Sequence, residues 1–159
     1  MNPKRISVAR GVVTGTTAGL VSLLALAIRG RIELKSVVAP LNAPSQWLWG
    51  DSALRQRQWS WRYTGAGAAI HQASAILWGL LHEQRGPQSA APLRDAVVTT
   101  ATAALVDLAL TPQRFTPGFE KRLSLKGLAW VYAAFAIGLA VASRAQRPRA
   151  TSTSTLGPV

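Results

Sequence analysis

The sequence has no cysteine and is poor in charged residues. Without cysteine, disulfide bonds, zinc sites with cysteine ligands, iron–sulfur clusters and thiol nucleophiles are excluded. Charged residues make up 15% of the 159 residues, against about 25% in an ordinary soluble domain. Apolar residues make up 48%, which argues against a chain that is disordered throughout, because such chains are poor in apolar residues and rich in charge.

Acidic residues are especially scarce: 6 Asp and Glu face 18 Lys and Arg, for a formal net charge of +12. Such an excess is typical of proteins that bind nucleic acid or an anionic membrane surface. The basic residues lie outside four long apolar stretches instead of recurring among the core residues of helices. We therefore expect the lipid bilayer and its anionic headgroups as partners, and no nucleic acid.

The four apolar stretches have the length of membrane-spanning helices. About 20 residues of helix cross the roughly 30 Å hydrocarbon layer of a bilayer. We predict an all-α integral membrane bundle of four transmembrane helices over residues 1–145, followed by a disordered tail over 146–159. A positive start and Ala25-Leu26-Ala27 give the first span some features of a signal peptide, but three further spans favour an uncleaved anchor. The expected spans cover residues 11–28, 63–82, 95–112 and 126–143.

The connection from Arg29 to Arg62 is the longest and is rich in tryptophan and arginine. Tryptophan rings beside arginines suit the headgroup layer, where the ring is buried and its N–H reaches water. They also suit stacking on single-stranded nucleic acid, but the flanking spans place this loop against lipid. We predict four interfacial anchors: Trp47, Trp49, Trp59 and Trp61.

Basic residues divide almost evenly between the two sides of this four-span arrangement, so the positive-inside rule sets no clear orientation. Eight Lys and Arg lie with the termini and the second connection, and ten lie in the first and third connections. Those near the termini sit tight against the spans, which favours both termini in the cytoplasm. In the third connection, Thr116 and Pro117 predict a helix start, with Glu120 in its first turn.

Small residues recur every fourth position in two of the spans. Gly11, Gly15 and Gly19 lie on one face of the first, and Ala134 and Gly138 begin a similar face in the fourth. Such faces let neighbouring helices approach closely in a membrane. They predict packing inside the bundle, with self-association as the alternative.

Four polar residues form a candidate intramembrane site. His71, Gln72 and Ser74 lie in the second span, and Asp107 lies in the third. Ionisable residues at this depth are costly and favour a functional interpretation. The structural alternative is a neutral His71 bonded to Ser74 or to the threonines of the third span, and an Asp107 paired with Arg114 or with a basic residue that starts the fourth span.

No catalytic residue, metal site or cofactor is predicted. The two histidines, His71 and His82, are 11 residues apart on one helix, about 16 Å, so they cannot ligate the same iron. Glutamates are too few for a di-iron carboxylate site. The sequence also has no phosphate-binding glycine loop and no nucleophile with a base and an orienting acid. We expect a protein that is not an enzyme.

Several short motifs together resemble a known family. They are the segment Gly15–Ser22, Glu33, Ala39-Pro40, the histidine-bearing second span, and Leu110-Thr111-Pro112 at the end of the third. In this order they are similar to the small bacterial inner-membrane proteins of the YagU type. The resemblance implies a multi-pass protein of the inner membrane with a role in acid tolerance.

Two functions are open at this stage. The first is an accessory, assembly or envelope-stress factor without enzymatic activity, whose partners are other membrane proteins or a second copy of the chain. The second is a proton or small-molecule conduit that uses His71 and Asp107. The two differ in whether these side chains share a polar cavity.

Overall fold

The structure is a computed structural model that describes residues 3–84 and 91–147. Within these ranges every regular element is a helix, which confirms the all-α prediction. The turn expected at Gly86-Pro87 and the tail from residue 148 onward lie outside the described residues.

Four long helices occupy the four apolar stretches. A π-helical turn, Trp61–Gly65, leads directly into α5, and a second one, Val106–Leu110, continues α6. The helices therefore extend a few residues beyond the ranges expected from charge alone, except at the end of the third. They are α1 (Pro3–Leu34), α5 (Ala66–Glu83), α6 (Pro92–Leu105) and α7 (Leu125–Ala145).

Two helical segments are long and apolar enough to cross a membrane by length and composition: Val8–Leu34 and Leu125–Ala145. The α-helical part of α6 has only 14 residues, and α5 contains His71, Gln72 and His82, which lower its mean hydropathy. Helix length and composition thus give weak support for membrane association, and support from two helices only.

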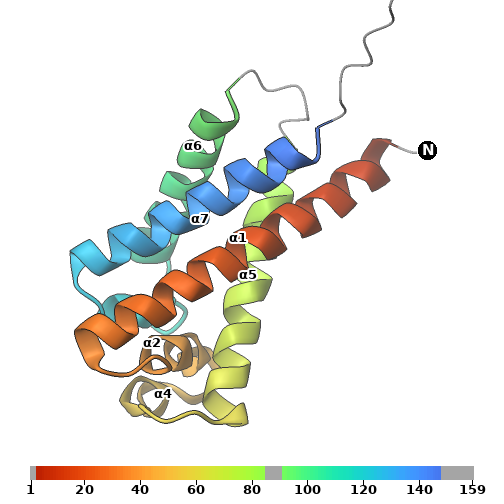
Figure 1. The fold of residues 1–159 in the computed structure, drawn as a ribbon. Coiled ribbons are helices and arrows are strands. Elements are labelled where there is room, and N and C mark those ends of the chain that lie inside the picture. Colours follow the sequence, from red (N-terminus) through yellow and green to blue (C-terminus); the bar gives the residue numbers. More distant parts are fainter. Residues whose placement is uncertain (1–2, 85–90, 148–159) are drawn as a thin grey trace, which may run out of the picture.

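The long helices form two crossing pairs. α1 and α7 lie side by side, and α5 and α6 cross behind them (Figure 1). α1 packs on both α5 and α7, and α6 packs mainly on α7. α5 and α6 have few contacts with each other, so a space remains between them.

Glycines allow the close crossing of α1 with α5 and α7. A Cβ atom added to Gly79 would lie 2.4 Å from the Cα of Gly15, and one added to Gly138 would lie 2.6 Å from the Cα of Ala18. Gly11 and Gly19 also face α5, and Ala134 is half-buried on α7. The small-residue faces therefore lie at contacts between helices of one chain, the first of the two alternatives drawn from the sequence.

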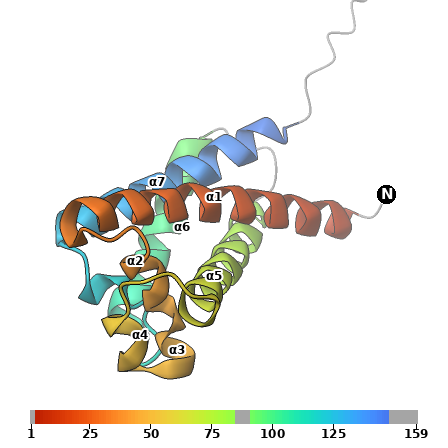
Figure 2. The ribbon, with the colours of Figure 1, turned by 60° about the horizontal axis from the view of Figure 1, so that its bottom comes forward.

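Four short helices form a cap at one end of the long helices; we call residues 39–55 the helical cap (Figure 2). Buried Asn42 ties it to the start of α5: its Nδ2 donates to the carbonyls of Gln56 and Gln58 at 3.3 and 3.1 Å, and its Oδ1 accepts from Thr64 Oγ1 at 2.6 Å. The cap consists of α2 (Ala39–Asn42), the 3₁₀ turn Ala43–Ser45, α3 (Gln46–Trp49) and α4 (Asp51–Arg55).

The last long helix starts later than Thr116 and Pro117 predict. Gly118 adopts a left-handed conformation with φ 83°, followed only by the 3₁₀ turn Phe119–Lys121. Ser124 caps α7 by accepting from the backbone N–H of Gly127 at 3.1 Å. Glu33 of α1 in turn accepts from Ser124 N at 2.7 Å. The expected start at Thr116 is wrong because the chain reverses at Gly118.

Candidate functional site

A cavity of about 60 Å³ lies where α5 and α6 diverge, larger than one water molecule needs. Its apolar walls include four aromatic rings: Trp47, Trp78, Phe119 and Phe135. Its polar groups come from three long helices, α1, α5 and α7, and from the π-helical turn after α6: Ser22, His71, Ser74, Asp107 and Tyr132.

His71 is fixed by α1 rather than by the partners expected from the sequence. Its Nε2 lies 2.9 Å from Ser22 Oγ, and the Ser22 hydroxyl donates to the carbonyl of Gly19 at 3.1 Å. Ser22 thus links the imidazole ring of His71 to the backbone of α1. The edge of the imidazole also meets the ring of Phe119, with 6.3 Å between centroids.

Asp107 accepts a hydrogen bond across the cavity. The hydroxyl of Tyr132 on α7 donates to its Oδ2 at 3.1 Å. Arg114, the partner expected from the sequence, instead donates to the backbone carbonyls of Trp47 and Leu48 at 3.3 and 3.5 Å. Among the residues that the structure describes, no basic side chain forms an ion pair with Asp107.

Three of the four candidate polar residues thus line one cavity, and the fourth does not. His71, Ser74 and Asp107 line it. Gln72 points to α1, where its Nε2 donates to the carbonyl of Thr16 at 3.3 Å. Its amide also packs where a side chain on Gly19 would otherwise stand. Gln72 therefore belongs to the contact between α1 and α5.

Glu120 is the residue of this region that sequence reasoning missed. Both of its carboxylate oxygens are buried without a hydrogen-bond partner among the described residues. Its charge is close enough to repel that of Asp107. Neither fact is visible in the sequence, because the two residues are 13 positions apart and on different elements. A buried carboxylate without a partner is rare in proteins and calls for an explanation.

The four tryptophans of the first connection have two different environments. Trp47 lines the cavity, and its Nε1 donates to the carbonyl of Thr116 at 3.0 Å. Trp49 meets Tyr63 edge to face and carries the guanidinium of Arg62 over its ring. Trp59 and Trp61 are 57% and 78% exposed and stack edge to face at 5.0 Å. Only this last pair has the exposure of an interfacial anchor.

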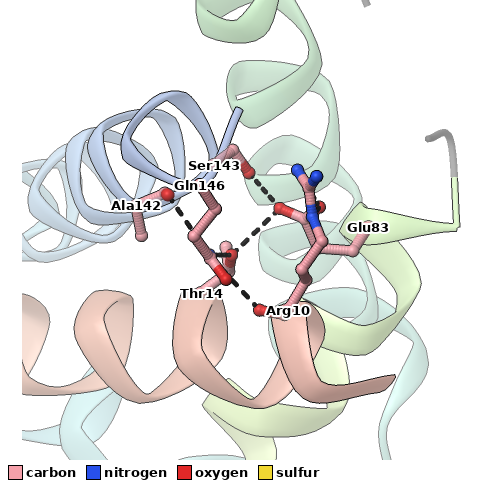
Figure 3. Close-up of polar contacts among 6 residues, drawn as sticks. All are labelled: Arg10, Thr14, Glu83, Ala142, Ser143 and Gln146. Carbon is pink, nitrogen blue, oxygen red and sulfur yellow. Dashed lines mark hydrogen bonds and ion pairs between the residues drawn. The ribbon is translucent and has the colours of Figure 1, made fainter. Parts of the chain in front are cut away.

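A second polar cluster closes the other end of the long helices (Figure 3). The buried carboxylate of Glu83 on α5 forms an ion pair with Arg10 of α1 at 3.0 Å. It also accepts from the hydroxyls of Thr14 on α1 and Ser143 on α7. Gln146 extends the cluster by donating to Thr14 Oγ1 at 2.8 Å. Three helices are thereby joined at one carboxylate.

The hydrogen bonds of this cluster set the ionisation of Glu83. Burial raises its pKa, but the hydroxyls of Ser143 and Thr14 and the charge of Arg10 together outweigh that effect. The pKa of Glu83 is therefore lower than its usual value. At the opposite end of α1, the pKa of Glu33 is also lowered, chiefly by the backbone N–H of Ser124. Both carboxylates act as ionised links between helices.

Comparison with protein-family models, with curated proteins and with solved structures finds no match to this chain. The resemblance to the YagU-type proteins therefore stays a prediction. In the described part of the chain, no three His, Asp or Glu side chains are grouped as ligands for a metal ion.

Proposed function

We propose that this protein crosses a bacterial inner membrane with four helices and binds a small molecule in the cavity, without catalysing a reaction. The observation that carries the binding proposal is the convergence of His71, Asp107 and Tyr132 on one cavity with aromatic walls. Binding sites for small molecules are typically apolar hollows with a few polar groups that orient the ligand.

The exposed faces of the long helices support the membrane setting. Large apolar side chains are exposed on each of them, including Leu24, Leu77, Val97 and Ile137. Monomeric soluble proteins rarely expose apolar surface on this scale. A lipid environment would cover these side chains, and the buried polar groups would face the interior of the bundle.

Charged residues bracket the apolar part of the helices at a spacing that fits a bilayer. Arg10 and Arg29 on α1 are 19 residues apart, about 28 Å of helix. Lys126 and Arg144 on α7 are 18 residues apart, about 27 Å. Both lengths are close to the roughly 30 Å of the hydrocarbon layer. α5 crosses α1 at Gly11, Gly15 and Gly19, which lie within this apolar length.

Reporter fusions test the four-span arrangement. Fusions after Arg29, Arg85, Gly118 and Arg149 should alternate between the two sides of the membrane. Fusions after Arg85 and Arg149 that report opposite sides would overturn the arrangement.

Of the two functions considered from the sequence, the cavity favours the conduit for protons or small molecules. We propose only the binding step of that function. An accessory or envelope-stress role rests on the fold alone, whereas the shared cavity of His71 and Asp107 is the feature by which the two hypotheses differ. The cavity also gives the proposal a direct test, because one alanine on α6, Ala103, lines it.

Fluorine NMR of 2-fluoroethanol, a small alcohol that suits a cavity of about 60 Å³, tests binding to the purified protein in detergent. Wild-type protein should broaden the ligand resonance, and Ala103→Val should weaken this effect because it adds two carbon atoms inside the cavity. Ala101→Val is the matched control, since Ala101 is exposed on the same helix. Equal broadening by both variants would mean that the alcohol binds elsewhere or only partitions into detergent.

A further inference from the structure

Although basic residues are in large excess, only some of the acidic residues form ion pairs with described residues. Three of the six are ion-paired: Glu33 with Arg29, Glu83 with Arg10, and Asp95 with Arg94. Asp51 is exposed to solvent. The remaining two, Asp107 and Glu120, form no ion pair with any described residue.

One of these two acids, Asp107, lines the cavity. Glu120 is not part of the lining, but it directly follows Phe119, which is. Its unpartnered carboxylate is close enough to Asp107 to add to the negative charge there. Among the described residues, none of the basic side chains nearest in the sequence forms an ion pair with either acid. Lys121 Nζ donates to Gln46 Oε1 and to the carbonyl of Gln113, and Arg114 donates to the helical cap.

The chain has 18 Lys and Arg, so two nearby acids that form no ion pair with the described residues indicate a binding site for an external cation. A buried charge is costly unless it is paired. Neutralisation by a ligand would remove both that cost and the repulsion between Asp107 and Glu120. The Tyr132 hydroxyl, already bonded to Asp107, would hold the carboxylate in position.

The walls of the cavity indicate what kind of cation fits. Trp47, Trp78, Phe119 and Phe135 present aromatic rings beside the acidic end. Aromatic faces attract organic cations and bury apolar groups, whereas a small metal ion would need several oxygen ligands in place of rings. We propose that the cavity binds a small organic ammonium ion, with its charged group at Asp107 and Glu120 and its apolar body against the rings. This inference rests on the proposed binding function.

A matched pair of ligands tests it: 2-fluoroethylammonium and 2-fluoroethanol, which have the same fluoroethyl body and nearly the same size but differ in charge. Binding of each to the purified wild-type protein is measured by fluorine NMR in the same zwitterionic detergent. Because hydrogen bonds between charged groups are about twice as strong as neutral ones, we expect the ammonium ion to bind at least about tenfold more tightly.

Three acid-to-amide variants locate the charge. Asp107→Asn should reduce ammonium binding to the level of alcohol binding by the same variant, because the asparagine has no charge while its oxygen still accepts from Tyr132. Glu120→Gln should give a smaller loss of ammonium binding. Asp51→Asn removes one exposed acid and should change neither ligand, which controls for the loss of net charge.

The outcomes separate the two proposals. Tighter ammonium binding that Asp107→Asn abolishes supports the cation site. Equal binding of the two ligands by wild type overturns the cation site and leaves the small-molecule cavity standing. Ammonium binding that is unchanged in both Asp107→Asn and Glu120→Gln also overturns it. If neither ligand binds, both the cation site and the binding function fail.

Discussion

The closest contact between α1 and α5 makes a quantitative prediction for Gly79→Ala. The added Cβ would lie 2.4 Å from the Cα and N of Gly15 and 2.5 Å from the carbonyl oxygen of Gly11. Carbon atoms in contact normally lie about 3.5–4.0 Å apart, so the two helices must separate by about 1 Å. All three atoms belong to the backbone, so no side chain can move aside to accommodate the methyl group.

The expected cost follows from two opposing effects. Overpacking of this kind costs about 1–3 kcal/mol, and rigid backbone on the far side favours the upper half of that range. Replacing glycine by alanine in a helix returns about 1 kcal/mol. Gly79→Ala should therefore lower the free energy of unfolding by about 1–2 kcal/mol, measured by unfolding in detergent followed by far-UV circular dichroism.

Gly65→Ala is the matched control, because Gly65 has helical φ and ψ of −63° and −49° at the start of the same helix. Its added Cβ would meet only the side chain of Trp61, at 3.2 Å, and that exposed ring can move. This variant should be stabilised by up to about 1 kcal/mol. Equal stabilisation by both substitutions would refute the close contact of α1 with α5.

Three further predictions concern other contacts. Glu83→Gln should lower the free energy of unfolding by about 2 kcal/mol at neutral pH. Ionised Glu83 stabilises the wild type above its unfolded pKa near 4.5, and this stabilisation is lost as the pH falls through the lower folded pKa. The unfolding temperature of the wild type should therefore fall more steeply with acid than that of the variant. Ser22→Ala should cost about 1 kcal/mol in the same unfolding assay, because it removes the hydrogen bond between α1 and the ring of His71; Thr17→Ala, whose hydroxyl bonds its own helix, should cost little. A variant that keeps Trp61 as its single tryptophan can be reconstituted in lipid. Its fluorescence should be quenched more by lipids brominated near the headgroup than by lipids brominated at the chain end, because Trp61 is exposed in the interfacial loop. The reverse order would place that loop deep in the bilayer.

The long helices were predictable because their signal is local and strong. Stretches with little or no charge mark all four, and the four-residue spacing of Gly11, Gly15 and Gly19 marks the face of α1 that meets α5. The limits of α7 were predicted less well from Thr116 and Pro117, because the left-handed turn at Gly118 depends on packing against the carbonyl of Ala43 in the helical cap. Such contacts between distant segments leave no periodic pattern in the sequence.

The polar site was predictable in its members but not in its pairings. A histidine and an aspartate within apolar stretches stand out by chemistry alone, and both line the cavity. Their partners, Ser22 and Tyr132, come from other helices, and no sequence pattern links them to His71 and Asp107. Glu120 was expected only as a residue in the first turn of a helix, because it lies among other charged residues in the sequence, and only the fold buries its carboxylate oxygens.

The central position of α1 has a consequence for synthesis of the chain. α1 leaves the ribosome before the other long helices, yet it contacts segments translated much later: Glu33 meets Ser124 across 91 positions, and Thr14 meets Gln146 across 132. Until α7 is translated, the glycine face, Glu33 and Thr14 of α1 lack part of their partners. A nascent chain interrupted after α6 would thus present an incomplete bundle, which membrane proteases and chaperones can distinguish from the finished protein.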